Sequence, residues 1–110
     1  DDLLRIIKRA CDPVTAVKIA AFGALRNISI VGGDSVIETL VSLDVMTPSI
    51  AMWQKAMTDV ALMKSKTPPE NTGGVEEVLA NILALISNVC ESSDVAVTAF
   101  FSSNATANIF

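Results

Sequence analysis

Two stretches of the chain follow one pattern, AAFGALRNI at residues 20–28 and NILALISNV at residues 81–89. When Asn27 is superposed on Asn88, the shared positions are apolar and have helical spacing. The superposed pairs are Val17 with Val78, Ala21 with Ile82, Ala24 with Leu85, Leu25 with Ile86 and Ile28 with Val89. A repeated helix of this kind buries its apolar face only against its neighbours. The pattern therefore predicts a solenoid of stacked helices, in which a long groove holds another protein.

The composition fits one all-α domain. Of the 110 residues, 51% are hydrophobic and 5% aromatic, which is too apolar for a disordered chain. No apolar run approaches the roughly eighteen residues that span a bilayer, and two cysteines are too few for a disulfide framework. These features predict a soluble protein in a reducing compartment. Because the chain opens on Asp1 without a methionine, we interpret it as a segment of a longer protein.

Charge is unevenly distributed along the chain. Residues 1–30 hold five basic and three acidic groups, whereas residues 31–110 hold three basic and nine acidic groups, a balance of −6. An acidic surface disfavours nucleic acid, whose binding requires a basic patch, and favours a cationic partner. Solubility alone explains the same imbalance, so charge does not by itself identify a partner.

Capping residues and helix breakers divide the chain into helices. The pairs Asp12-Pro13 and Thr47-Pro48 each predict a cap followed by proline at a first helical position, and Gly32-Gly33 predicts a helix end. The predicted helices cover residues 1–10, 13–30, 34–43, 47–64, 75–90 and 94–102. The order of short, long and asparagine-bearing helices is that of an armadillo repeat.

We therefore predict an armadillo/HEAT-like, right-handed α-solenoid segment forming one domain over residues 1–110. Residues 1–30 would end a first repeat, 34–91 would form a second repeat, and 94–110 would begin a third. The two asparagines lie 61 residues apart, whereas such units have about 40 to 47 residues. The prolines and glycines around residues 64–74 predict a long loop that releases the extra residues, with a lengthened second helix absorbing the rest.

The sequence offers few residues that could support catalysis. The absence of histidine excludes Ser-His and Cys-His nucleophiles and histidine-based metal sites. The two cysteines make no zinc motif, and neither glycine pair is followed by the lysine of a phosphate-binding loop. We predict no catalytic residue, no cofactor and no metal site.

Several motifs, in order along nearly the whole chain, resemble the N-terminal armadillo repeats of the symportin family, also called HEAT repeat-containing protein 3. These motifs are GALRNIS at residues 23–29, Gly32-Gly33, Val36, DVMTP at 44–48, NVCE at 88–91, Ala96-Val97 and Phe100. The region of Trp53 and the residue Ser87 depart from the family pattern.

The resemblance implies an adaptor and chaperone of the cytoplasm and nucleus. It would carry large-subunit ribosomal proteins of the 5S particle in nuclear import, and its groove would hold a basic ribosomal-protein segment. An importin-β-type receptor would bind regions outside this chain. The alternatives are an armadillo scaffold with another client and a structural helical domain of a larger assembly.

Asparagines carry the most concrete binding chemistry, because an amide offers both a donor and an acceptor to a peptide backbone. The tryptophan ladder of importin-α-like receptors is absent, since Gly23 and Ala84 occupy those positions. Helical spacing of four and three predicts one polar stripe on the second asparagine helix. A solvated surface stripe, or an asparagine bonded between repeats, explains the same pattern. The predicted groove residues are Asn27, Glu77, Asn81, Asn88 and Glu91.

Overall fold

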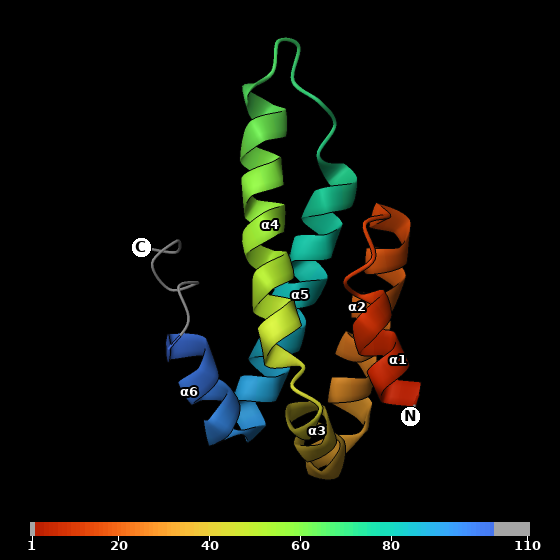
Figure 1. Ribbon diagram of the computed structural model, residues 1–110, viewed down its shortest axis with the longest axis vertical. Helices are drawn as coiled ribbons and strands as arrows, with labels where there is room; N and C mark the ends of the chain where they lie inside the picture. Colours follow the sequence, from red (N-terminus) through yellow and green to blue (C-terminus); the bar gives the residue numbers. More distant parts are fainter. Residues whose placement is uncertain (1, 103–110) are drawn as a thin grey trace.

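The computed structural model describes residues 2–102, which form six α-helices and no strand (Figure 1). The helices are α1 (Asp2–Arg9), α2 (Thr15–Val31), α3 (Gly33–Ser42), α4 (Met46–Ser65), α5 (Gly73–Ser92) and α6 (Asp94–Ser102). The predicted all-α class is confirmed. Residues 103–110 of the third repeat predicted at 94–110 lie outside the described residues.

Helix α5 is the central element of the molecule. Its most extensive contacts are with α2 on one side and α4 on the other (Figure 1). Helices α2 and α5 run parallel, because Gly74 lies beside Thr15 near their beginnings and Asn88 reaches Ser29 near their ends. Helix α4 runs antiparallel to α5 (Figure 1). Parallel packing of the two asparagine-bearing helices is what a solenoid requires, while the right-handed superhelix stays a prediction.

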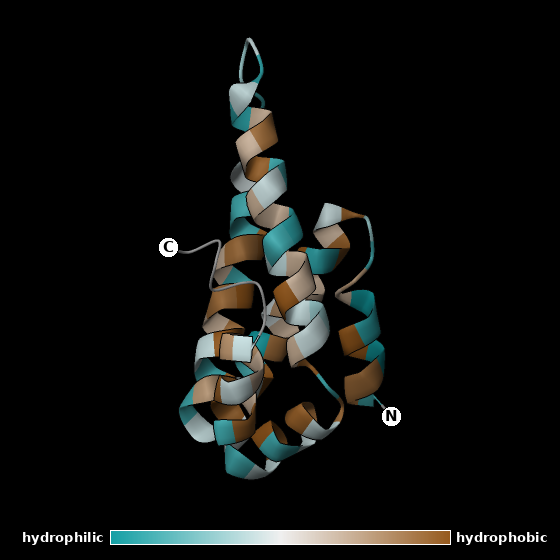
Figure 2. Cartoon of the chain, turned by 60° about the vertical axis from the view of Figure 1, so that its left-hand side comes forward, coloured by the Kyte–Doolittle hydropathy of each residue, from teal (hydrophilic) through white to brown (hydrophobic). Residues whose placement is uncertain are grey.

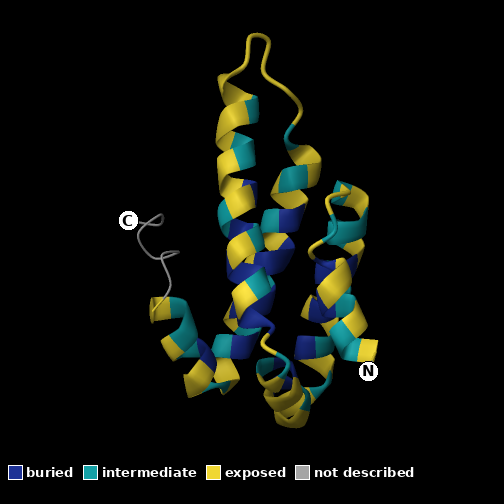
Figure 3. Ribbon diagram, viewed as in Figure 1, coloured by how far each residue is buried: buried dark blue, intermediate teal, exposed yellow. Residues whose placement is uncertain are grey.

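The core lies along α5, where it packs against α2 on one side and α4 on the other, and buried residues concentrate there (Figure 3). Along each helix, hydrophobic and hydrophilic bands alternate, as expected for amphipathic helices (Figure 2). The superposition of the two asparagine helices therefore identified real core positions. Buried members of the superposed pairs are Ala21, Leu25, Val78, Ile82, Leu85, Ile86 and Val89.

By length and composition alone, α5 meets the criterion for a membrane span, and α3 with α4 would count as a second, bent one. The prediction that no apolar run approaches the length of a membrane span is therefore wrong by this criterion. The core helix of a globular protein passes the same test. In this structure α5 buries its apolar side against α2 and α4, so we assign it to the core.

Two predicted helix starts need correction. The carboxylate of Asp12 accepts a 2.8 Å hydrogen bond from the Val14 N–H, and α2 begins two residues after Pro13. Before α4, Asp44 has a φ of 57°, and its Oδ1 atom accepts hydrogen bonds from the Thr47 N–H and hydroxyl at 3.4 and 3.0 Å. Helix α4 therefore begins one residue before Thr47, and an upstream aspartate bonds its first turn.

The helix end predicted at Gly32-Gly33 is confirmed, since α2 ends at Val31. Gly33 has a φ of 70°, which glycine tolerates without a steric cost. A Cβ atom on Gly32 would lie 2.4 Å from Cγ2 of Val36, so α3 approaches this backbone closely. The glycine pair thus permits the sharp turn between α2 and α3.

Helices α4 and α5 form a hairpin that projects beyond the other helices (Figure 1). Its loop covers only residues 66–72, because each helix extends to 20 residues and takes up much of the insert. The Met63 carbonyl accepts hydrogen bonds from the N–H groups of Lys66 and Glu70. The Nζ atom of Lys64 lies 3.5 Å from Oε1 of Glu76. The pKa of the Glu76 carboxyl is lowered, most strongly by the hydrogen bond from the Thr72 hydroxyl and less strongly by the charge of Lys64. The loop is shorter than the predicted 64–74 and has its own hydrogen bonds.

We expect a broad-specificity protease at low concentration to cleave first within residues 66–72, because this loop is almost wholly exposed and lies at the tip of the hairpin. Mass spectrometry of the early products measures the cleavage site. Initial cleavage within α3 or α5 would contradict these helix boundaries.

Candidate protein-binding face

The five predicted groove residues lie in different environments. Asn27, Glu77 and Glu91 are exposed, and Asn88 is half-buried. Asn81, in contrast, is only 8% exposed. The predicted polar stripe of α5 is thus not a single solvated surface, because part of it faces α2.

Asn81 joins α5 to α2. Its Oδ1 atom accepts a 3.2 Å hydrogen bond from Nη1 of Arg26, and its Nδ2 atom donates a 3.4 Å hydrogen bond to the Ile19 carbonyl. Gly23 of α2 lies beside this amide, and a Cβ atom there would meet Nδ2 at 3.6 Å, an ordinary van der Waals distance. The interpretation of Asn81 as an open groove residue is therefore corrected: it is a buried contact between the two helices.

Asn88 combines both interpretations of the asparagines. Its Nδ2 atom donates a 3.0 Å hydrogen bond to the Ser29 hydroxyl, which in turn donates to the Arg26 carbonyl at 2.6 Å. Within residues 2–102 the Oδ1 atom of Asn88 has no hydrogen-bond partner. The Nδ2 atom of this amide is bonded to α2, and its Oδ1 atom is an acceptor available to a ligand.

The predicted residues other than Asn81 are exposed or half-buried, and we call Asn27, Glu77, Asn88 and Glu91 the α2–α5 face. Asn27 is exposed on α2, one turn after Gly23, which lies beside Asn81. Glu77 and Glu91 lie roughly 21 Å apart along α5 at 1.5 Å per residue. An extended peptide of about six residues spans that distance.

A hollow of about 300 Å³ opens at one end of this face, between the end of α2, the start of α3 and the end of α5. Its polar lining includes two predicted residues, Asn88 and Glu91. The sequence analysis missed the other polar residues, Ser29, Asp34 and Ser92. These residues come together because α2 and α5 run parallel. The C-terminal ends of both helices and the start of α3 therefore lie at one place.

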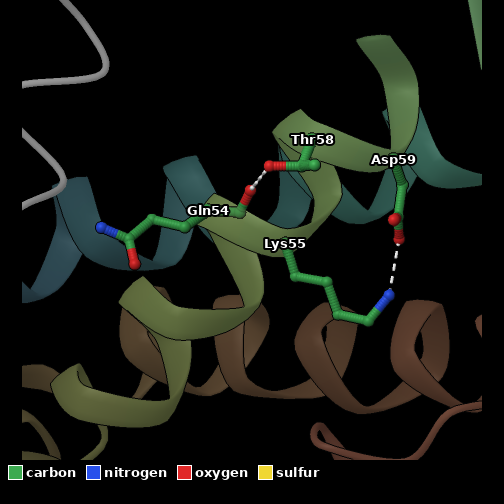
Figure 4. A network of polar contacts seen from close by, with 4 residues as sticks. All are labelled: Gln54, Lys55, Thr58 and Asp59. Atoms are coloured by element: carbon green, nitrogen blue, oxygen red, sulfur yellow. Dashed lines mark hydrogen bonds and ion pairs between the residues drawn. The ribbon is translucent and has the colours of Figure 1, made fainter. Parts of the chain in front are cut away.

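The exposed side of α4 is a weaker candidate for a binding surface. The exposed side of α4 carries local contacts, a 2.7 Å ion pair from Lys55 to Asp59 and a 3.1 Å hydrogen bond from the Thr58 hydroxyl to the Gln54 carbonyl (Figure 4). Such i,i+4 contacts characterise a solvated helix surface. Within residues 2–102 no group of three or more cysteine, aspartate or glutamate side chains is arranged to hold a metal ion.

Comparison with known proteins gives two close matches. The chain is 31% identical over 105 residues to HEAT repeat-containing protein 3 of Homo sapiens and 32% identical over 102 residues to the protein of the same name in Mus musculus. Each match covers 91% of this chain and 15% of the relative, so the chain spans about one seventh of the length of these relatives. No protein-family model and no solved structure matches the chain.

Proposed function

Because the chain belongs to the HEAT repeat-containing protein 3 family, which it matches over 91% of its length, we propose that it binds an extended basic segment of another protein on the α2–α5 face. The observation that carries the proposal is the set of acceptors along α5: two exposed carboxylates, Glu77 and Glu91, with the unpaired Oδ1 atom of Asn88 near one end. Carboxylates attract lysine and arginine, and an amide oxygen accepts a hydrogen bond from a peptide N–H.

A protein that contains this segment would act as a non-enzymatic adaptor. Its proposed client is a large-subunit ribosomal protein, brought to the nucleus with an importin-β-type receptor that binds outside this chain, so that the adaptor passes between cytoplasm and nucleus. The motifs shared with the symportin family support this assignment, because they extend through the asparagine helices.

One basic residue lies beside the face and bears on the proposal. Arg26 directs its Nη1 atom to Asn81, two turns before Asn88 on α5. Because Arg26 places a positive charge near the centre of the face, a bound cation is expected to lie closer to Glu91 than to Asn81. The buried bonds of Asn81 also favour a structural role for part of the asparagine pattern, as in a helical domain whose face packs against the rest of an assembly.

Isothermal titration of the chain with a lysine- and arginine-rich ribosomal-protein segment at two salt concentrations tests the proposal. The variant Glu77→Gln with Glu91→Gln is expected to weaken binding about threefold to tenfold at low salt, because partly exposed ion pairs each contribute modestly. The affinity of this variant for the segment should also depend less on salt concentration than that of the wild-type chain.

The matched control is Glu38→Gln with Asp94→Asn, which makes the same charge change at exposed residues of α3 and α6. If the control weakens binding as much as the test variant, the attraction is a general effect of net charge. If the wild-type chain does not bind the segment, the proposed function is wrong.

A further inference from the structure

The hollow at the ends of α2 and α5 has a feature that the proposed groove alone does not require. It is lined by two carboxylates from different helices, Asp34 of α3 and Glu91 of α5. Within residues 2–102 neither side chain makes an ion pair or a hydrogen bond. Two like charges facing one hollow repel each other, and a bound cation would relieve that repulsion.

The helix ends favour the same charge. Parallel helices α2 and α5 both finish beside the hollow, and neither has a basic residue in its last turn. The C-terminal end of a helix carries a partial negative charge that is ordinarily offset by a cation. Helix α3 begins at the same place with the opposite polarity, and its N-terminus offsets part of the negative charge of Asp34.

Neutral groups in the hollow complete the set of acceptors. The Oδ1 atom of Asn88 has no partner within the described residues, and the Nδ2 atom of the same amide is held by Ser29. This bond restrains the orientation of the amide, so the acceptor is positioned before a ligand arrives. Ile30 and Ile37 supply apolar lining for an aliphatic stem. The guanidinium of Arg26, one turn before Ser29 on α2, bonds to Asn81 and does not neutralise the hollow.

We infer that the hollow is a pocket for a single basic side chain, with arginine preferred to lysine. The guanidinium would lie between Asp34 and Glu91 and donate to Oδ1 of Asn88, with its stem against the isoleucines. Arginine is preferred because its planar group has five donors in a fixed arrangement and reaches several acceptors at once. The inference rests on the proposed function, since the side chain would belong to the bound basic segment.

Single-residue compounds test the pocket without the full segment. We would titrate the ¹⁵N-labelled chain with N-acetyl-arginine amide, N-acetyl-lysine amide and the neutral N-acetyl-citrulline amide, following the side-chain amide of Asn88 and the backbone amide of Asp34. The arginine compound should shift both signals saturably, the lysine compound should bind more weakly, and the citrulline compound should leave them unchanged. Shifts that are absent, or equal with citrulline, would overturn the pocket.

The variant Asp34→Asn with Glu91→Gln should weaken binding of the arginine compound about fivefold, as expected for two partly exposed charges. The control Glu38→Gln with Asp94→Asn should bind as the wild type does. An unchanged affinity in the first variant would also overturn the pocket. If the long basic segment binds while the arginine compound does not, the pocket is wrong and the proposed function stands; the reverse outcome rejects the function and keeps the pocket.

Discussion

Replacing Phe22 by alanine is expected to lower the free energy of unfolding by about 3 to 5 kcal/mol. Phe22 is 1% exposed and is among the largest fully buried side chains of the molecule. It lies on α2, whose most extensive contact is with α5. The substitution removes an aromatic ring and leaves a cavity that the surrounding helices can fill only in part. Urea denaturation followed by circular dichroism measures the change.

Leu62→Ala is the control for this prediction. Leu62 is 58% exposed on α4, so its truncation should change stability by less than about 0.5 kcal/mol. A loss below about 1 kcal/mol for Phe22→Ala would contradict the packing of α2 against the rest of the core.

The three asparagines should separate clearly in the same assay. Asn81→Ala is expected to cost about 1 to 3 kcal/mol, because it removes both hydrogen bonds to α2 and leaves a buried gap. Asn88→Ala loses one partly exposed hydrogen bond to Ser29 and should cost about 0.5 to 1.5 kcal/mol. Asn27→Ala should have almost no effect on stability, since within the described residues the Asn27 side chain makes no hydrogen bond.

Binding measurements on the same variants distinguish the two roles. Asn88→Ala should weaken binding of the basic segment and also lower the free energy of unfolding. Asn81→Ala should lower the free energy of unfolding without changing the binding affinity. Equal unfolding free energies for all three variants would contradict the placement of Asn81 between the helices.

The fold could be predicted in some detail from local signals. Glycine pairs, Asp-Pro and Thr-Pro pairs and apolar spacing located all six helices, and the limits of α6 are those predicted. The error at the start of α4 arose because two residues compete as its cap. An aspartate upstream of α4 supplies the acceptor that we had assigned to Thr47, and a cap cannot be chosen from sequence when neighbouring side chains offer the same bond.

The face of α5 could be predicted only in part. Its apolar side followed from the spacing of Val78, Ile82 and Leu85, which are all buried. Periodicity alone could not separate the buried polar residues of α5 from the exposed ones. The spacing of one helix does not show which of its edges a neighbouring helix covers. Asn81 is bonded to residues 55 and 62 positions away in the chain, so its burial depends on a long-range contact. The lining from Ser29 and Asp34 was missed for the same reason.

Photo-crosslinking tests most directly whether a basic segment lies on the α2–α5 face. Benzoylphenylalanine would replace Asn27, which is exposed on α2, or Leu62, which is exposed on α4, across α5 from α2 (Figure 1). After irradiation with a lysine- and arginine-rich ribosomal-protein segment, mass spectrometry measures the adducts. The account predicts a crosslink from position 27 that excess unlabelled segment removes, and none from position 62. A specific crosslink from position 62 without one from position 27 would contradict it.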